Sequence, residues 1–227
     1  MNKNIEQEKE LAANEAVKLI NNNMIVGLGT GSTARYAIEA IGKMVKEGLC
    51  IRAIPTSNTT KELAESLGIT IIDINTIEAI DITIDGADEF TEDLVLIKGG
   101  GGALLKEKIV ASLTKVEIII ADSSKKVDVL GKFKLPIEVI PFASSYVLNQ
   151  IKISGGSGKI RRAAGDLFIT DEGNYIIDAD FGAITNPVQL SVKLNEIEGL
   201  VAHGLFINLA SKVIMGINGT TREFNKQ

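Results

Sequence analysis

The sequence of 227 residues contains one histidine, one cysteine and no tryptophan. A single cysteine excludes an intrachain disulfide and a Cys-x-x-Cys redox pair, and a single histidine excludes a metal centre built from thiols and imidazoles. Nucleophilic catalysis of the Ser-His or Cys-His type would have to use His203 alone. If the protein is an enzyme, its acid–base chemistry therefore rests on carboxylates, lysines and backbone amides.

Aromatic residues and positive charge are also scarce. Aromatics make up 4% of the chain, and 24 Lys and Arg residues stand against 29 Asp and Glu residues, a formal net charge of −5. This balance argues against a nucleic-acid partner, which requires basic and base-stacking surfaces. No apolar run approaches the ~18 residues of a membrane span, and the charged stretch 1–17 is unlike a signal peptide. We therefore expect a cytoplasmic protein with no membrane partner.

The two rare side chains both lie among apolar neighbours. His203 is surrounded by the residues of 200–206, and Cys50 lies between Leu49 and Ile51. We interpret His203 as a structural residue of the second half of the chain, and Cys50 as a small buried hydrophobe.

Helix-like and strand-like segments alternate in the first half of the chain. Apolar strands separated by helices are typical of a parallel sheet covered on both faces, the doubly wound α/β class. After about Gly131, short strands punctuated by Pro and Gly indicate a small α+β domain with antiparallel pairing. We predict an α/β domain over 1–131, completed by 207–227, and a small α+β domain over 132–206. The expected helices are 6–21, 34–45, 61–67 and 103–113, and the expected strands are 24–26, 49–54, 69–74, 80–84, 116–121, 167–170, 175–178 and 212–217.

A glycine-rich run, Gly27-Leu28-Gly29-Thr30-Gly31-Ser32-Thr33, joins the first strand to a helix. Open parallel sheets bind their ligands after strands in this way, and free N–H groups at a helix start suit a phosphate. A Walker loop would need Gly-Lys before its Ser or Thr. The dinucleotide fingerprint would need glycine in place of Ser32 and an acidic residue ending the second strand. A tight turn without a ligand is the alternative interpretation.

Three carboxylates follow the predicted strand 80–84 in the segment Asp85-Gly86-Ala87-Asp88-Glu89. In a dry site such carboxylates repel one another, so some would have raised pKa values or cationic partners. The alternative is a solvated turn with a helix cap, where Asp and Glu are common.

Four consecutive glycines follow Lys98 and precede the predicted helix 103–113. A flexible linker is the usual interpretation, but this run joins a strand to a helix within a compact unit, which indicates a loop that wraps a ligand. Glu107 has only apolar residues three and four positions away in that helix. Such surroundings should raise its pKa, which suits a general base, whereas a distant Lys or Arg partner is the alternative.

Two further polar segments follow predicted strands. Asp122 and Ser123 could cap a helix, while Lys125 could supply charge to a phosphate. The run 56–60, Thr-Ser-Asn-Thr-Thr, is better explained as a helix cap than as a site, although it could line a pocket.

Taken in this order, the motifs resemble those of the type A ribose-5-phosphate isomerase family over nearly the whole chain. The matching stretches are GLGTGSTA at 27–34, TSNTT at 56–60, DGADE at 85–89, KGGGGALLKEK at 98–108, ADSSKKVDVLGKFKLPIEVIP at 121–141, TDEGNYIIDADF at 170–181 and GLVAHGLF at 199–206.

This resemblance implies a Rossmann-like domain with an inserted ferredoxin-like domain, assembled as a homodimer or homotetramer without a metal or other cofactor. It implies that Glu107 is the proton acceptor and that Asp85, Asp88 and Lys98 complete the catalytic set. Lys9 falls where some members place a substrate-contacting lysine. The implied substrate-binding residues are Thr30, Gly31, Ser32, Thr33, Asp85, Gly86, Ala87, Asp88, Lys98, Gly99, Gly100, Gly101 and Lys125.

One departure from the family pattern is visible, because Lys106 stands where members commonly have arginine. Lysine keeps the charge and loses the guanidinium fork, which puts in question an ion pair near the base.

The implied reaction interconverts D-ribose 5-phosphate and D-ribulose 5-phosphate through a cis-enediolate. Glu107 would move the proton between C2 and C1, Asp85 and Asp88 would steer protons on the neighbouring oxygens, and Lys98 would offset the charge that develops. The loop 27–33, or Lys125 with it, would hold the phosphate. The alternatives are an acyl-CoA transferase with a nucleophilic glutamate, a sugar-phosphate sensing module, which would need an appended DNA-binding segment, and a bare NAD(P) domain.

Overall fold

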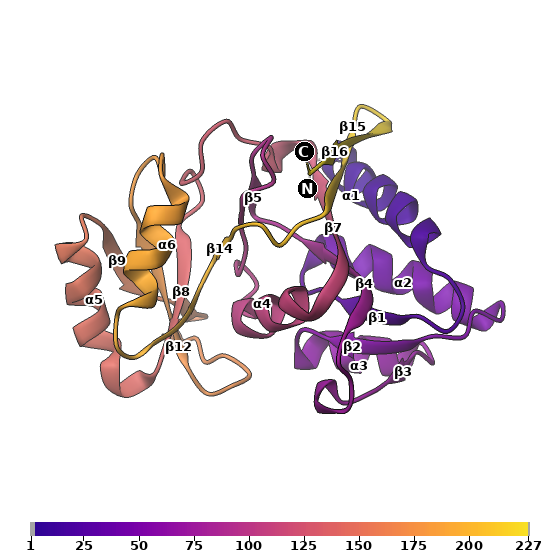
Figure 1. Ribbon diagram of the computed structural model, residues 1–227, viewed down its shortest axis with the longest axis horizontal. Coiled ribbons are helices and arrows are strands. Elements are labelled where there is room, and N and C mark those ends of the chain that lie inside the picture. Colours follow the sequence, from indigo (N-terminus) through magenta and orange to yellow (C-terminus); the bar gives the residue numbers. More distant parts are fainter. Residues whose placement is uncertain (1–2, 227) are drawn as a thin grey trace.

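The computed structural model describes residues 3–226 and is built around a sheet of seven strands (Figure 1). The strand order is β16-β15-β7-β4-β1-β2-β3, and every pair is parallel except β15 with the edge strand β16. This arrangement confirms the predicted α/β class with a mostly parallel sheet. The strands are β1 Ile25–Leu28, β2 Arg52–Pro55, β3 Thr70–Ile71, β4 Ile80–Gly86, β7 Thr114–Asp122, β15 Lys212–Ile217 and β16 Thr220–Asn225.

Helices cover both faces of this sheet. α1 (Lys3–Ala16), α2 (Ser32–Lys46) and α3 (Asn58–Ser66) pack with Ile82 and Ile84 in one apolar core. Side chains alternate along a strand, so Thr83 and Asp85, the neighbours of Ile82 and Ile84 in β4, face the opposite side of the sheet. On that side lies α4 (Leu104–Leu113), so the alternation in β4 places Asp85 beside the helix that carries Glu107. None of the described helices is long and apolar enough to cross a membrane.

A second, antiparallel sheet lies in the other part of the molecule, in the strand order β13-β8-β12-β9 (Figure 1). Two helices, α5 (Ser144–Ile153) and α6 (Pro187–Asn195), accompany this sheet and share its apolar core. Two small sheets complete the fold, the pair β10-β11 and the three strands β14-β6-β5. The remaining strands are β5 Glu89–Phe90, β6 Leu96–Ile97, β8 Leu135–Val139, β9 Ser157–Ile160, β10 Arg162–Ala163, β11 Asp166–Leu167, β12 Tyr175–Asp180, β13 Leu200–His203 and β14 Leu205–Phe206.

Most predicted elements are present, and the differences have local causes. The strand 212–217 returns to the large sheet beside β7, as predicted. The strand predicted over 69–74 is reduced to β3, because the Asp73 side chain accepts a hydrogen bond from the Asn75 N–H and begins a 3₁₀ turn. The strand predicted over 167–170 pairs regularly only at its start, within the β10-β11 hairpin.

The prediction for Cys50 is wrong, because its side chain is exposed. Its backbone N–H donates to the Asn22 Oδ1 atom and its carbonyl accepts from the Asn23 N–H, so the chain at Cys50 is fixed to a surface loop just before β2 begins.

Candidate active site

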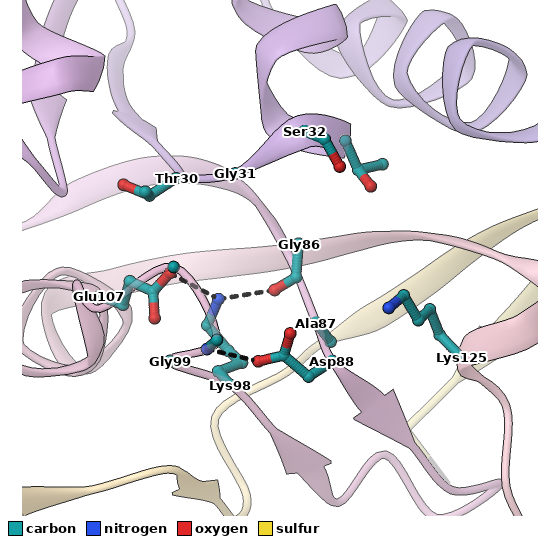
Figure 2. Close-up of a pocket in the computed structure, with 13 residues that line it drawn as sticks. Thr30, Gly31, Ser32, Gly86, Ala87, Asp88, Lys98, Gly99, Glu107 and Lys125 are labelled. Atoms are coloured by element: carbon teal, nitrogen blue, oxygen red, sulfur yellow. Dashed lines mark hydrogen bonds and ion pairs between the residues drawn. The ribbon is translucent and has the colours of Figure 1, made fainter. Parts of the chain in front are cut away.

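Three polar segments meet at one edge of the large sheet. β1, β4 and β7 are parallel, so the residues that follow them, near Thr30, Asp88 and Lys125, are brought to the same edge. They surround a cavity of about 230 Å³, together with the glycine run after β6 and the first turn of α4 (Figure 2). The lining residues are Thr30, Gly31, Ser32, Thr33, Gly86, Ala87, Asp88, Lys98, Gly99, Gly100, Gly101, Glu107 and Lys125.

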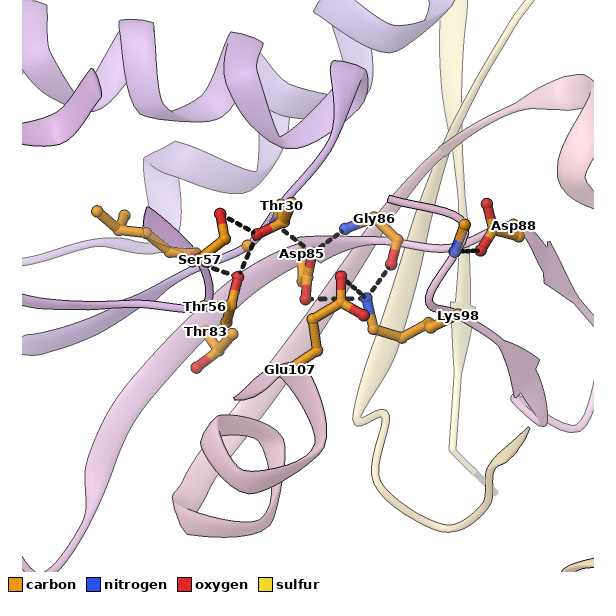
Figure 3. A network of polar contacts seen from close by, with 12 residues as sticks. Thr30, Thr56, Ser57, Thr83, Asp85, Gly86, Asp88, Lys98 and Glu107 are labelled. Atoms are coloured by element: carbon orange, nitrogen blue, oxygen red, sulfur yellow. Dashed lines mark hydrogen bonds and ion pairs between the residues drawn. The ribbon is translucent and has the colours of Figure 1, made fainter. Parts of the chain in front are cut away.

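All residues predicted for the site line this cavity except Asp85 and Lys9, and Lys9 contacts the Ser32 hydroxyl instead. Asp85 is 1% exposed and lies behind the cavity wall (Figure 3). Its Oδ1 atom accepts hydrogen bonds from the Thr30 N–H at 3.0 Å and the Gly86 N–H at 2.7 Å, and its Oδ2 atom lies 2.8 Å from the Lys98 Nζ atom. Asp85 thus joins the first glycine loop to Lys98.

The Lys98 ammonium is enclosed by oxygen atoms. Its Nζ atom lies 2.6 Å from the Gly86 carbonyl, 2.8 Å from Asp85 and 3.4 Å from the Glu107 Oε1 atom (Figures 2 and 3). The Phe206 ring centroid is 5.4 Å away. Burial by itself lowers the pKa of Lys98, but the Asp85 and Glu107 carboxylates raise it above the usual lysine value. The lysine is therefore a permanent cation in the cavity wall.

Glu107 lies in the first turn of α4 and is 4% exposed. Burial raises its pKa to about 8, because the negative charges of Asp85 and Asp88 add to the cost of burial and Lys98 offsets only part of it. Its Oε2 atom is buried without a hydrogen-bond partner among the described residues. A carboxylate with one free oxygen and a pKa near neutrality is suited to accept and return a proton.

Asp88 is held by the four-glycine run. Its Oδ2 atom accepts a hydrogen bond from the Gly100 N–H at 2.7 Å, and a Cβ atom on Gly100 would lie 2.4 Å from its Oδ1 atom. A side chain at position 100 would therefore displace the Asp88 carboxylate, and glycine lets the loop approach it. Burial raises the pKa of Asp88, while the Gly100 hydrogen bond and nearby cations oppose that rise.

The start of α2 forms the opposite wall of the cavity. Gly31 is the N-cap residue and supplies no side-chain cap, so the first N–H groups of the helix are not occupied by a capping side chain. The Thr30 hydroxyl is held by those of Thr56 and Ser57, at 2.7 and 2.9 Å. The Lys9 Nζ atom reaches the Ser32 Oγ atom at 3.1 Å. These features suit an anion at the helix start, with Lys125 as a facing cation (Figure 2).

Two predicted caps are present. Ser57 is the N-cap of α3 and accepts from the Thr60 N–H, while Asp122 caps a 3₁₀ turn and accepts from the Ser124 N–H. No residue of 56–60 lines the cavity, so this segment acts by holding Thr30.

His203 has the contacts of a structural residue. Its Nδ1 atom accepts from the Leu205 N–H and its Nε2 atom lies 3.1 Å from the Ser191 Oγ atom. Burial, reinforced by the Lys108 cation, lowers its pKa to about 3, so the ring is neutral. Lys106, in the family's arginine position, still forms ion pairs, at 2.9 Å with Glu172 and 3.5 Å with Asp171.

Three residues beside the site were not predicted from the sequence. Arg161 donates to the carbonyls of Gly99 and Gly100, and Phe206 packs beside Lys98. Glu117 lies within the strand predicted as apolar over 116–121, is 1% exposed, and contributes to the raised pKa of Lys98. The only available signal was for Glu117, as the single charge in an apolar run.

Comparison with known proteins gives one consistent result. The family model for ribose 5-phosphate isomerase A (phosphoriboisomerase A) matches residues 52–219. Curated ribose-5-phosphate isomerase A proteins of Streptococcus agalactiae (strain NEM316) and Bacillus mycoides are 49% and 48% identical over 217 residues, covering 95% of this chain and 97% and 98% of theirs.

Solved structures agree with these sequence matches. A D-ribose-5-phosphate isomerase in complex with phospho-erythronic acid superposes with a TM-score of 0.95 at 39% identity, covering 98% of this chain and 99% of that one. The ribose 5-phosphate isomerase of Plasmodium falciparum superposes with a TM-score of 0.94 at 38% identity, covering 98% of this chain and all of that one.

Proposed function

The chain belongs to the ribose 5-phosphate isomerase A family and is an aldose–ketose isomerase of the pentose phosphate pathway, and we propose that Glu107 is the base that moves its proton. The reaction interconverts D-ribose 5-phosphate and D-ribulose 5-phosphate. It requires removal of the C2 proton from the open-chain aldose, its return to C1, and proton exchange between the two oxygens. A cis-enediolate is the intermediate in this proposal.

The free Oε2 atom of Glu107 is the single observation that carries the proposal. This atom is buried, has no hydrogen-bond partner among the described residues, and belongs to a residue that lines the cavity. Because desolvation raises the pKa of the carboxyl to about 8, the carboxylate is a stronger base than an exposed glutamate would be. One carboxylate that first accepts the proton at C2 and then donates it at C1 completes the transfer.

Lys98 stabilises the oxygen on which negative charge develops. Its three nearest oxygen atoms are those of Gly86, Asp85 and Glu107, and the Glu107 contact is the longest at 3.4 Å. A substrate oxygen that replaces this contact would gain an ammonium donor and would leave the Glu107 carboxylate free to face the carbon. In a buried site this exchange stabilises the enediolate more than it would in water.

The two aspartates have different roles in this proposal. Asp85 does not line the cavity and is a positioning residue that holds Lys98 and the Thr30 backbone. Asp88 lines the cavity, and its raised pKa allows it to exchange a proton with a substrate hydroxyl.

The phosphate binds at the start of α2, where uncapped N–H groups and the Ser32 and Thr33 hydroxyls face Lys125 across the cavity. The similar isomerase solved with phospho-erythronic acid, a sugar phosphate analogue, supports a small phosphorylated ligand for this chain. The phosphate anchors the open-chain sugar so that C1 and C2 reach Glu107.

Cytoplasmic location and assembly into a homodimer or homotetramer remain proposals. Two large apolar side chains near the four-stranded antiparallel sheet are strongly exposed, Phe142 at 98% and Ile153 at 70%. Such exposure supports assembly. Light scattering coupled to size-exclusion chromatography measures the state, and a monomer at micromolar concentration would contradict the proposal.

The Glu107→Gln variant tests the base directly. We expect kcat to fall by about 10²–10⁴-fold with a smaller change in KM, because the amide keeps the shape and cannot accept the proton. Wash-out of the C2 proton of the substrate into D₂O should fall in parallel. The matched control is Glu62→Gln on the exposed side of α3, which should retain wild-type rates. Turnover near wild type in Glu107→Gln would remove Glu107 as the base.

A further inference from the structure

A second, larger cavity of about 590 Å³ lies beside the catalytic one and is strongly cationic. Its wall carries five positive side chains and one carboxylate, in a protein whose formal net charge is −5. Gly100 lines both cavities. The lining residues are Gly100, Lys132, Phe133, Lys134, Lys159, Ile160, Arg161, Arg162 and Asp178.

The only carboxylate of this cavity is already neutralised. Arg161 forms a two-point contact with Asp178, with its Nη2 atom 2.5 Å from Oδ1 and its Nε atom 3.1 Å from Oδ2. Lys132, Lys134 and Lys159 form no ion pair among the described residues.

Arg162 likewise has no carboxylate partner among the residues described and donates only to the Gly165 carbonyl. Four cations thus line one cavity without a carboxylate partner in the described part of the chain, residues 3–226. Their mutual repulsion is relieved if an anion occupies the cavity.

The arrangement of these cations indicates a ligand with more than one anionic group. Lys132 and Lys134 lie in the segment that precedes β8, whereas Lys159 and Arg162 belong to β9 and β10. The four cations lie on two separate segments, and the cavity of about 590 Å³ is larger than the catalytic one of about 230 Å³, so it has room for more than one anionic group. A polyphosphate of small-molecule size satisfies both observations.

Arg161 connects this cavity to the catalytic loop, the glycine run 99–102 between β6 and α4. Its side chain is 13% exposed, and its Nη1 atom donates to the carbonyls of Gly99 and Gly100, at 3.2 and 3.0 Å. The Gly100 N–H in turn holds Asp88. A ligand bound to Arg161 would therefore be connected to Asp88 through Arg161 and Gly100.

We propose that the cavity lined by Lys132, Lys134, Lys159 and Arg162 is a binding site for a small polyphosphate anion, separate from the sugar-phosphate site and connected to it through Arg161. This proposal goes beyond the isomerase reaction and does not depend on the role assigned to Glu107.

Inorganic pyrophosphate is the probe, titrated calorimetrically into the whole protein at low ionic strength. Equilibrated ribose 5-phosphate and ribulose 5-phosphate are kept at saturating concentration, so that the catalytic cavity is occupied without net turnover. We expect one pyrophosphate per chain, bound at least tenfold more tightly than inorganic phosphate under the same conditions.

The double variant Lys132→Ala, Lys159→Ala should weaken pyrophosphate binding at least tenfold. The control is Lys43→Ala, Lys46→Ala, which removes the same charge from exposed positions of α2. In activity assays pyrophosphate should change kcat for the wild type and leave kcat of the Lys132→Ala, Lys159→Ala variant unchanged.

Three results would overturn the proposal. Loss of pyrophosphate binding when substrate is present, or purely competitive inhibition that the cavity variant retains, would place the anion in the catalytic cavity. If the control Lys43→Ala, Lys46→Ala weakened pyrophosphate binding equally, the effect would be explained by net charge alone. Absence of binding at millimolar pyrophosphate would exclude the site.

Discussion

At the scale of single residues, burial and neighbouring charges together set the pKa values of the groups in the site. Burial by itself lowers the pKa of Lys98, but the Asp85 carboxylate at 2.8 Å and Glu107 raise it above the usual lysine value, so the lysine stays cationic. Glu107 is farther from the ammonium, at 3.4 Å, and feels two other carboxylates, so its proton is held more tightly. The same burial that would be costly in a structural glutamate gives Glu107 the raised pKa that its proposed role as the base requires.

The pH dependence of kcat/KM should therefore report Glu107. We expect an acidic limb with a midpoint near 8, far above the value of an exposed glutamate, because the carboxyl must lose its proton before it can accept one. Asp88→Asn removes one of the negative charges that raise this pKa, so the midpoint should move to lower pH. Asp93→Asn, at an exposed position, is the control for the change of charge. An unchanged midpoint in Asp88→Asn would contradict this coupling.

The raised pKa of Glu107 also predicts a stability effect. The folded protein holds this proton up to about pH 8, whereas the unfolded chain releases it near 4.5. Wild-type stability from this group is therefore greatest below pH 4.5 and is lost as pH rises toward 8. Glu107→Gln does not titrate, so its Tm relative to wild type should be higher at pH 8.5 than at pH 5.5. A difference in Tm that is constant with pH would count against the assigned shift.

The residues of the site differ in how far sequence could predict them. Glu107 was predictable because its neighbours at three and four positions along one helix are apolar, which is a local property. Glu117 and Arg161 were not, since their burial and contacts come from segments far away in the chain. Arg161 reaches the catalytic loop from a position 61 residues beyond Gly100.

At the scale of elements, the glycine run between β6 and α4 acts as a shaped loop rather than a linker. Gly100 approaches Asp88 so closely that a Cβ atom would overlap the carboxylate. Gly101, the next residue, has only an ordinary contact, with the Thr30 Cγ2 atom 3.5 Å from the Cβ position. Gly99 and Gly102 have positive φ and also lie too close to neighbouring side chains for a Cβ atom, so Gly101 is the position of the run that accepts one without a clash.

Two alanine variants separate these positions. Gly100→Ala should lower kcat/KM by about tenfold or more, because Asp88 must move and displacement of a positioned group is costly to catalysis. Gly101→Ala should have a smaller effect, since its Cβ atom meets no clash. Circular dichroism checks that both variants fold, and equal losses in the two would argue against the Asp88 contact as the cause.

At the scale of the whole molecule, α4 connects the two sheet regions (Figure 1). It packs on β4 and β7 of the large sheet and on β13 and β8 of the small one. The Lys106 ion pairs with Asp171 and Glu172 add a link from this helix to the segment before β12. The division into domains 1–131 with 207–227 and 132–206 remains a prediction, while the two separate sheets are observed.

Ligand binding should accordingly stabilise the molecule as a whole. At about 100 times Kd, equilibrated substrate should add about 2.7 kcal/mol. This corresponds to a rise in Tm of about 5–10 °C for a chain of this size. D-ribose at the same concentration is the control, because it lacks the phosphate for which we propose a site at the start of α2. Thermal unfolding followed by circular dichroism measures the shift, and an equal rise with D-ribose would contradict the proposed phosphate site.

From the sequence alone follow the α/β class, the family resemblance and the set of carboxylates, lysines and glycines left once thiol and imidazole chemistry is excluded. These depend on composition, periodicity and local spacing, which the chain carries without folding. Only the tertiary structure decided that Asp85 lies behind the cavity while Asp88 lines it, that Cys50 is exposed, and that a cationic cavity adjoins the catalytic loop. Those properties depend on burial and on contacts between distant segments, and both arise only when the chain folds.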